Sequence, residues 1–229
     1  MMSRKLTTQE LAALIDHTVL RADATRADVL RVCEEAKQWG FAVIFIPPSY
    51  VVEAVEAVGR SAIRVGIPIG FPLGGHRTSI KVAEALDGVA CGARVLDMVI
   101  NISRLKSGDY DWVRRDMAAV CEATPGAEHK AILETCLLTK EELRIACRLA
   151  LEAGMDYVKT STGFSSGGAR VEDVRIMKEA VSGQAKVKAS GGIRDLPSML
   201  ALLDAGADRI GTSAGVDILR GGIGTGLDG

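Results

Sequence analysis

The chain has 229 residues, with 28 Lys and Arg against 29 Asp and Glu and a formal net charge of −1 at pH 7. This balance lacks the positive excess of proteins that bind nucleic acids or anionic membranes, so neither is expected as a partner. Charges or glycines interrupt every apolar stretch before it reaches transmembrane length, and the first residues lack the apolar core of a signal peptide.

The five cysteines are scattered without CxxC spacing, and all except Cys136 fall within predicted helices. We therefore expect reduced cysteines that pack in a core, and a cytoplasmic location. Hydrophobic residues make up 48% of the chain and aromatic residues only 4%. The core should thus be aliphatic, as in α/β barrels and doubly wound sheets.

One pattern recurs along the chain, namely a helix that ends in a small residue and Gly, followed by an apolar run. Such a Gly caps the carboxyl end of a helix, and the run after it predicts a buried parallel strand. Capping boxes mark helix starts after Thr7, Thr25 and Thr139. In chain order we expect a helix at about residues 8–14 and strands at residues 16–20, 41–46, 64–69, 94–100, 130–134, 156–159, 186–189 and 208–211.

Eight βα units in a chain of this length predict an α/β fold of the (β/α)8 TIM-barrel type, with a short N-terminal helix. We expect one barrel domain over residues 1–229, with a loose glycine-rich stretch at residues 221–229. An open doubly wound sheet is the alternative, but the GxGxxG motif that marks it does not follow the first strand.

Two lysines lie in predicted strands, where charge is costly to bury. Lys159 ends the strand at residues 156–159, and Lys188 stands in the strand at residues 186–189. Two neighbouring buried ammonium groups are unfavourable unless one loses its proton. A neutral lysine is a nucleophile toward carbonyl carbons, so the pair indicates Schiff-base chemistry.

Asp97 is the predicted partner of Lys159, because strand alternation turns both side chains toward one face of their strands. A purely structural salt bridge is the simpler interpretation. However, Lys188 adds a third charge to the lumen, and three charges fit pKa tuning better than stability. Lowering a lysine pKa from about 10.4 to about 7 costs roughly 5 kcal/mol, which a second ammonium and apolar walls can supply.

The sequence leaves open the roles of the other ionisable groups at the strand ends. Asp16 is a candidate catalytic residue, with an orienting or strand-capping role as the alternative, and Glu134 is expected to pair with a lysine in the lumen. Arg194 either contacts phosphate or serves the helix that follows. The three histidines form neither an HxH nor an HExxH pair, so no metal site is expected.

Glycines and a serine collect after the late strands, where TIM barrels hold phosphate with backbone N–H groups and a helix N-terminus. Each glycine alone is more often a turn residue. Together they predict a phosphate site formed by Gly163, Gly191, Gly192, Gly211 and Ser213.

Five segments, taken together and in order, resemble the deoxyribose-phosphate aldolase family: Gly70–Gly74, Leu96–Asn101, Leu133–Thr139, Val158–Phe164 and Val187–Arg194. The resemblance implies a class I aldolase on a TIM barrel that needs no metal or organic cofactor. Such an enzyme cleaves 2-deoxy-D-ribose 5-phosphate reversibly into D-glyceraldehyde 3-phosphate and acetaldehyde, in deoxyribonucleotide and carbohydrate catabolism. A phosphorylated sugar is then the expected small-molecule partner, and a homodimer is the expected assembly.

By this resemblance Lys159 forms the Schiff base, Lys188 depresses the pKa of Lys159, Asp97 relays protons with a water, and Asp16 assists at the substrate hydroxyl. The chain departs from the family pattern at Phe45, at Ala214 after Ser213, and in a tail without aromatic residues. Two alternatives are a non-catalytic phosphosugar-binding barrel and a phosphosugar isomerase or epimerase. Neither would need both lysines and Asp97.

Overall fold

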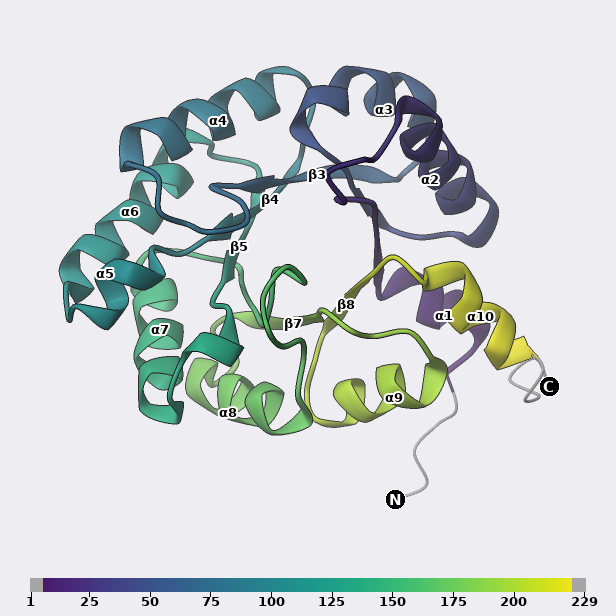
Figure 1. Ribbon diagram of the computed structural model, residues 1–229. Coiled ribbons are helices and arrows are strands. Elements are labelled where there is room, and N and C mark those ends of the chain that lie inside the picture. Colours follow the sequence, from purple (N-terminus) through teal and green to yellow (C-terminus); the bar gives the residue numbers. More distant parts are fainter. Residues whose placement is uncertain (1–5, 224–229) are drawn as a thin grey trace.

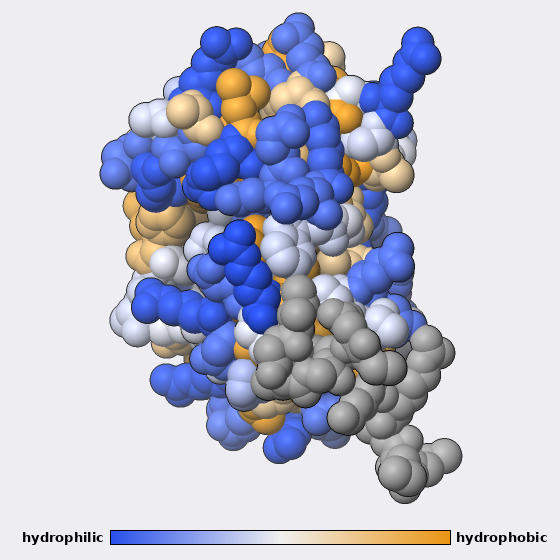
Figure 2. Space-filling model, turned by 90° about the vertical axis from the view of Figure 1, so that its right-hand side faces the viewer, coloured by the Kyte–Doolittle hydropathy of each residue, from blue (hydrophilic) through white to orange (hydrophobic). Residues whose placement is uncertain are grey.

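A computed structural model describes residues 6–223 of the protein. Eight parallel strands close into a barrel in the order β1 to β8, and the helices form a ring around it (Figure 1). The TIM barrel predicted from the sequence is therefore confirmed. The side that carries α2 and α10 is covered mostly by hydrophilic residues, with small hydrophobic areas between them (Figure 2).

The strands are short, as is usual for a barrel of this size. Their bounds are β1 Ile15–Thr18, β2 Val43–Phe45, β3 Arg64–Ile69, β4 Val95–Val99, β5 Glu128–Ile132, β6 Tyr157–Lys159, β7 Lys186–Ser190 and β8 Arg209–Thr212. The α-helices are α1 Thr8–Ala13, α2 Arg26–Trp39, α3 Val51–Val58, α4 Thr78–Ala90, α5 Ile102–Lys106, α6 Tyr110–Ala123, α7 Lys140–Glu152, α8 Val171–Val181, α9 Leu196–Asp204 and α10 Gly215–Ile223, and two 3-10 turns span Pro48–Tyr50 and Thr135–Leu137.

The helix ends form for the local reasons that their sequences indicate. Thr7, Thr25 and Thr139 each accept a hydrogen bond from the third residue of the helix that follows, and all three complete a capping box. Gly40 ends α2 with a φ of 78°, and Gly92, Gly154 and Gly206 also have positive φ just after helices. These left-handed positions favour glycine because a Cβ is unfavourable there.

Most expected strand boundaries differ from the structure by one or two residues, and three differences bear on the site or the chain end. β5 begins and ends two residues earlier than expected, because Glu134 has a φ of 54°, which an extended strand does not allow. β8 begins and ends one residue later than expected, so Gly211 lies within the strand and not among the loop glycines that follow the late strands. At the carboxyl end, Gly221–Ile223 belong to α10 rather than to a loose tail, and residues 224–229 lie outside the described part.

The barrel has two buried layers of different chemistry, one between the strands and the helices and one inside the lumen. Outward-facing strand residues such as Ile44, Leu96 and Val158 pack with the helices in one large aliphatic core. Each fully buried side chain of this kind contributes about 1.5–3 kcal/mol to stability. Inside the lumen, Val43, Phe45 and Val95 form a small apolar cluster. Buried charged side chains lie beside this cluster, so the outer layer stabilises the barrel while the inner layer carries the candidate chemistry.

Candidate active site

The four residues predicted to be catalytic meet in the lumen. The Nζ atoms of Lys159 and Lys188 each lie 2.7 Å from Oδ2 of Asp97. Lys188 Nζ is also 2.6 Å from Oδ2 of Asp16, and none of these side chains is more than 6% exposed. Strand register explains the meeting, because β6 and β7 pair Lys159 directly with Lys188. The expected salt bridge between Lys159 and Asp97 exists, but it is part of a larger cluster.

The electrostatics of this cluster make the two lysines different. Burial lowers the pKa of Lys159, Asp97 opposes that effect and Lys188 reinforces it, so that the pKa falls to about 8. Burial also opposes the charge of Lys188, but Asp16 and Asp97 together raise its pKa above the usual lysine value. Lys188 is therefore the permanent cation at neutral pH, whereas Lys159 has an appreciable neutral fraction.

Both aspartates stay ionised despite complete burial. Burial opposes their charge, but Lys159 and Lys188 hold the pKa of Asp97 below its usual value. Lys188 does the same for Asp16, with help from Lys130 and Arg209. The carboxylate of Asp97 thus lies between the nucleophilic amine and a fixed ammonium, where it is able to accept and return a proton.

Phe45 supplies the apolar wall of the cluster. Lys188 Nζ lies 3.8 Å from the centroid of the Phe45 ring, and Lys159 Nζ lies 5.4 Å from it. The ring fits because Gly66 has no side chain, and a Cβ at that position would lie 2.7 Å from a ring carbon. The ring face favours a nearby cation, and the closer approach favours the charge on Lys188.

Sequence reasoning missed two further lumen residues, Lys130 and Arg209. Lys130 is fully buried, pairs with Glu128 and lies 3.7 Å from Oδ1 of Asp97. Arg209 Nε donates to Oδ1 of Asp16 at 2.7 Å. The signal was present, because the alternation that selects Lys159 turns every second residue of a barrel strand inward. Both residues extend the ion network toward the amino end of the barrel.

Glu134 does not pair with a lumen lysine as expected. Its carboxylate accepts hydrogen bonds from the backbone N–H of Thr162, at 3.3 Å to each oxygen, and from the Thr162 hydroxyl. The left-handed backbone at Glu134 ends the inward alternation of β5. The side chain therefore faces the loop that follows β6 rather than the lysines.

The predicted phosphate residues line one cavity of about 390 Å3 together with Lys159 and Arg194. Gly163, Gly191 and Gly192 have φ values of 85°, 89° and 77°, which turn the backbone after β6 and β7. Ser213 is exposed two residues before the start of α10. Gly211 also lines the cavity but lies inside β8, where a Cβ would be 3.0 Å from Cε of Lys188.

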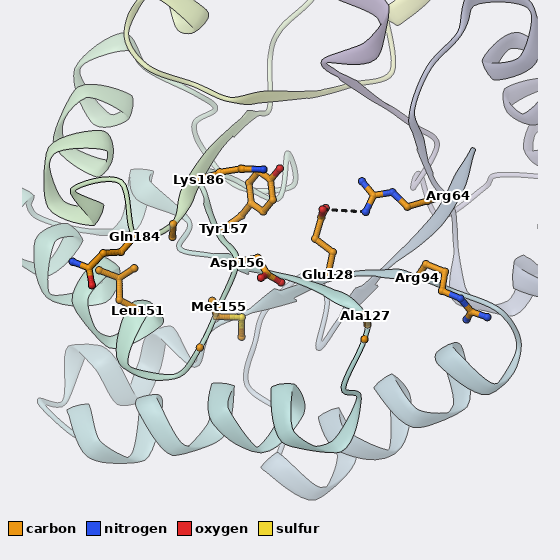
Figure 3. A pocket seen from close by; sticks show the side chains of 13 residues that line it. Arg64, Arg94, Ala127, Glu128, Leu151, Met155, Asp156, Tyr157, Gln184 and Lys186 are labelled. Atoms are coloured by element: carbon orange, nitrogen blue, oxygen red, sulfur yellow. Dashed lines mark hydrogen bonds and ion pairs between the residues drawn. The ribbon is translucent and has the colours of Figure 1, made fainter. Parts of the chain in front are cut away.

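A larger hollow of about 740 Å3 lies at the opposite end of the barrel, around the starts of β3 to β7 (Figure 3). Arg64 pairs there with Glu128, and the ring of Tyr157 extends between Glu128 and Lys186. Lys130 Nζ, 5.0 Å from the Tyr157 ring, lies between this hollow and the aspartates. The candidate active site is the smaller cavity, because Lys159 lines it and it lies at the carboxyl ends of the strands, where TIM barrels carry their catalytic residues.

The histidines take part in separate local contacts: His17 pairs with Glu35, and His129 contacts the Thr124 hydroxyl. Within residues 6–223, no three His, Cys, Asp or Glu side chains are grouped as a metal site. No helix in this part of the chain has the length and hydropathy needed to cross a membrane.

Comparisons with known proteins agree with this geometry. Residues 11–221 match the model of the DeoC/LacD family of aldolases. The chain is 50% identical over 212 residues to a deoxyribose-phosphate aldolase of Geobacillus sp. (strain WCH70), covering 92% of this chain and 95% of that protein. A relative of the same name in Exiguobacterium sp. (strain ATCC BAA-1283 / AT1b) is also 50% identical, covering 93% and 97%.

Among solved structures, the tetrameric deoxyribose phosphate aldolase of Aeropyrum pernix superposes with a TM-score of 0.88. It is 33% identical to this chain, and the match covers 96% of this chain and 94% of that one. The family match spans the whole barrel, from the strand that carries Asp16 to the last strand. The chain therefore belongs to the DeoC/LacD family of aldolases.

Proposed function

We propose that this aldolase cleaves 2-deoxy-D-ribose 5-phosphate reversibly to D-glyceraldehyde 3-phosphate and acetaldehyde, through a Schiff base on Lys159. One observation carries the proposal: a buried lysine with a pKa of about 8 shares the carboxylate of Asp97 with a lysine whose pKa is raised. Such a pair provides a neutral nucleophile beside a permanent charge. The curated relatives bear the name of this activity.

In the mechanism, the neutral amine of Lys159 attacks the C1 aldehyde of the open-chain sugar, and loss of water gives a protonated imine. The imine withdraws electrons, so that the C2–C3 bond breaks when the C3 hydroxyl loses its proton. The electrons of that bond form an enamine at C1 and C2. Protonation at C2 and hydrolysis then release acetaldehyde and return the free amine.

Asp97 and Asp16 divide the proton transfers in this proposal. Asp97 contacts Lys159 Nζ at 2.7 Å and moves protons to and from the imine with a water. Asp16 assists at the substrate hydroxyl, with its orientation set by Lys188 and by Arg209 at 2.7 Å. Lys188 remains charged throughout and opposes protonation of Lys159 before imine formation.

Trapping of the imine tests this function. Borohydride with acetaldehyde is expected to add a reduced two-carbon group to the peptide that contains Lys159, read by mass mapping. A non-catalytic phosphosugar-binding barrel, or an isomerase or epimerase, would yield no such adduct. An adduct confined to Lys188 or to surface lysines would contradict the assignment of Lys159.

The substrate phosphate is held in this proposal by backbone N–H groups near Gly163, Gly191, Gly192 and Ser213. The N-terminus of α10, which begins at Gly215, adds its favourable dipole. Arg194 lines the same cavity and supplies a guanidinium at its edge. Gly211 completes this wall by leaving room for the side chain of Lys188.

Substitution of Gly192 by Val tests the phosphate site, because a β-branched residue strains the backbone at a φ of 77°. KM for the phosphorylated sugar is expected to rise about tenfold or more, with a much smaller change for free deoxyribose. Gly183→Val is a matched control, since Gly183 has the same φ and equally open surroundings in the loop before β7. Equal effects on both substrates would remove Gly192 from the phosphate site.

We also propose a cytoplasmic location and a homodimer. All five cysteines are free thiols, as expected for a reducing compartment. Light scattering on the purified protein distinguishes a dimer from a tetramer like that described for the Aeropyrum pernix enzyme.

A further inference from the structure

Glu134 has an unusual backbone for its residue type. Of the residues that the structure describes, only Glu134 and Ser182 have positive φ without being glycine. Ser182 ends α8, where a left-handed residue is common. Glu134 instead follows β5 at the active-site end of the barrel, with a φ of 54° and a ψ of 64°. Such strain persists where the surrounding structure requires it, often near functional sites.

The strained backbone turns the Glu134 side chain toward the loop that follows β6. The buried carboxylate accepts from the N–H and the hydroxyl of Thr162, in the loop after β6. The hydroxyl oxygen of Thr162 in turn accepts from the N–H of Phe164 at 3.0 Å. These bonds enclose Gly163 between two fixed residues, four positions after Lys159. In Figure 1 this segment, coloured green, curls over the centre of the barrel.

The turn at Gly163 also fixes the neighbouring loop after β7. A Cβ on Gly191 would lie 3.6 Å from Cα of Gly163 and 3.1 Å from Cα of Gly168, so the two loops touch backbone to backbone. Ala169 N–H donates to the carbonyl oxygen of Gly191 at 3.0 Å. A shift of the Gly163 turn therefore moves Gly191 as well, and both residues line the cavity beside Lys159.

We propose that Glu134 is a positioning residue that holds the loops after β6 and β7 in the geometry needed to bind the substrate phosphate. The proposal rests on the proposed function, because it takes Gly163 and Gly191 as the phosphate cradle. Glu134 acts through Thr162 and not on the reacting atoms. It should thus govern affinity for the phosphorylated substrate rather than formation of the imine.

A double-mutant cycle with Glu134→Ala and Thr162→Val tests the proposal. Each variant is expected to raise KM for deoxyribose 5-phosphate by about tenfold or more, with kcat and the KM for free deoxyribose within about twofold. The effects of the two substitutions should be less than additive, because both break the contact between the Glu134 carboxylate and the Thr162 hydroxyl. Glu134→Gln, which keeps an acceptor oxygen, should recover part of the affinity.

Ser182→Ala is the control, because Ser182 also has a positive φ without being glycine but lies far from the phosphate loops. This substitution should leave both KM values unchanged. Additive KM effects, or equal losses with both substrates, would overturn the proposal, as would lower thermal stability with an unchanged KM. If Glu134→Ala does not fold, the nearly isosteric Thr162→Val carries the same test. Failure of imine trapping in the unaltered enzyme would instead reject the proposed function.

Discussion

Replacement of Lys159 by Arg is expected to lower kcat by about 10⁴-fold or more and to abolish the borohydride adduct. A guanidinium stays protonated at every accessible pH and cannot form the imine. Arg keeps a positive charge beside Asp97, so it can replace Lys159 in the ion pair that Lys159 makes with Asp97 at 2.7 Å. Loss of activity would then report on the missing amine rather than on an unpaired buried carboxylate.

Lys186→Arg provides the matched control for this experiment. Lys186 begins β7 on the exposed opposite end of the barrel, two residues before Lys188. The same substitution there should leave kcat within about twofold. A Lys159→Arg enzyme that keeps more than about a hundredth of the original kcat would show that another group forms the covalent intermediate or that none is formed.

The sequence was sufficient for those parts of the fold that have local causes. β3 matches its expected range of residues 64–69, and the three threonine caps form as their spacing indicates. Each of these features depends on a few consecutive residues. The convergence of Lys159 with Asp97 was also predictable, because the carboxyl ends of parallel barrel strands meet at one face.

The features that were missed depend on how neighbouring strands and loops are placed relative to one another. Alternation tells which residues of a strand face the lumen, but their depth depends on register with the neighbouring strands. Lys130 lies beside Asp97 because β4 and β5 pair these two residues directly. The turn at Glu134 was not predictable either, since glutamate rarely adopts positive φ and its partner Thr162 lies 28 residues away.

The lysines of the lumen share their carboxylate partners. Asp97 contacts Lys159 and Lys188 through one oxygen, and Lys130 lies 3.7 Å from the other. A proton on Lys159 places a second positive charge beside Lys188, which is unfavourable in a buried site. This repulsion adds to the effect of burial and agrees with the lowered pKa of Lys159.

Lys188→Leu is expected to move the acidic limb of the pH–rate profile to higher pH. In the unaltered enzyme the rate should fall below about pH 8, because the free amine of Lys159 begins the reaction and its pKa is about 8. Lys188 lowers that pKa, whereas Asp97 raises it. Loss of Lys188 removes the first effect and leaves Asp97 more strongly paired with Lys159, so both changes raise the pKa.

The shift should be about one to three pH units, as expected for a like charge in a site of low dielectric, and it should remove most of the rate at neutral pH. Trapping at Lys159 should still succeed at high pH, which shows that the fold and the nucleophile survive. Asp97→Asn is the opposing control, because loss of the carboxylate lowers the pKa of Lys159 while removal of the proton relay lowers the rate at every pH. If the acidic limb of Lys188→Leu stays in place, Lys188 does not tune Lys159, and its role is that of a hydrogen-bond donor or proton shuttle.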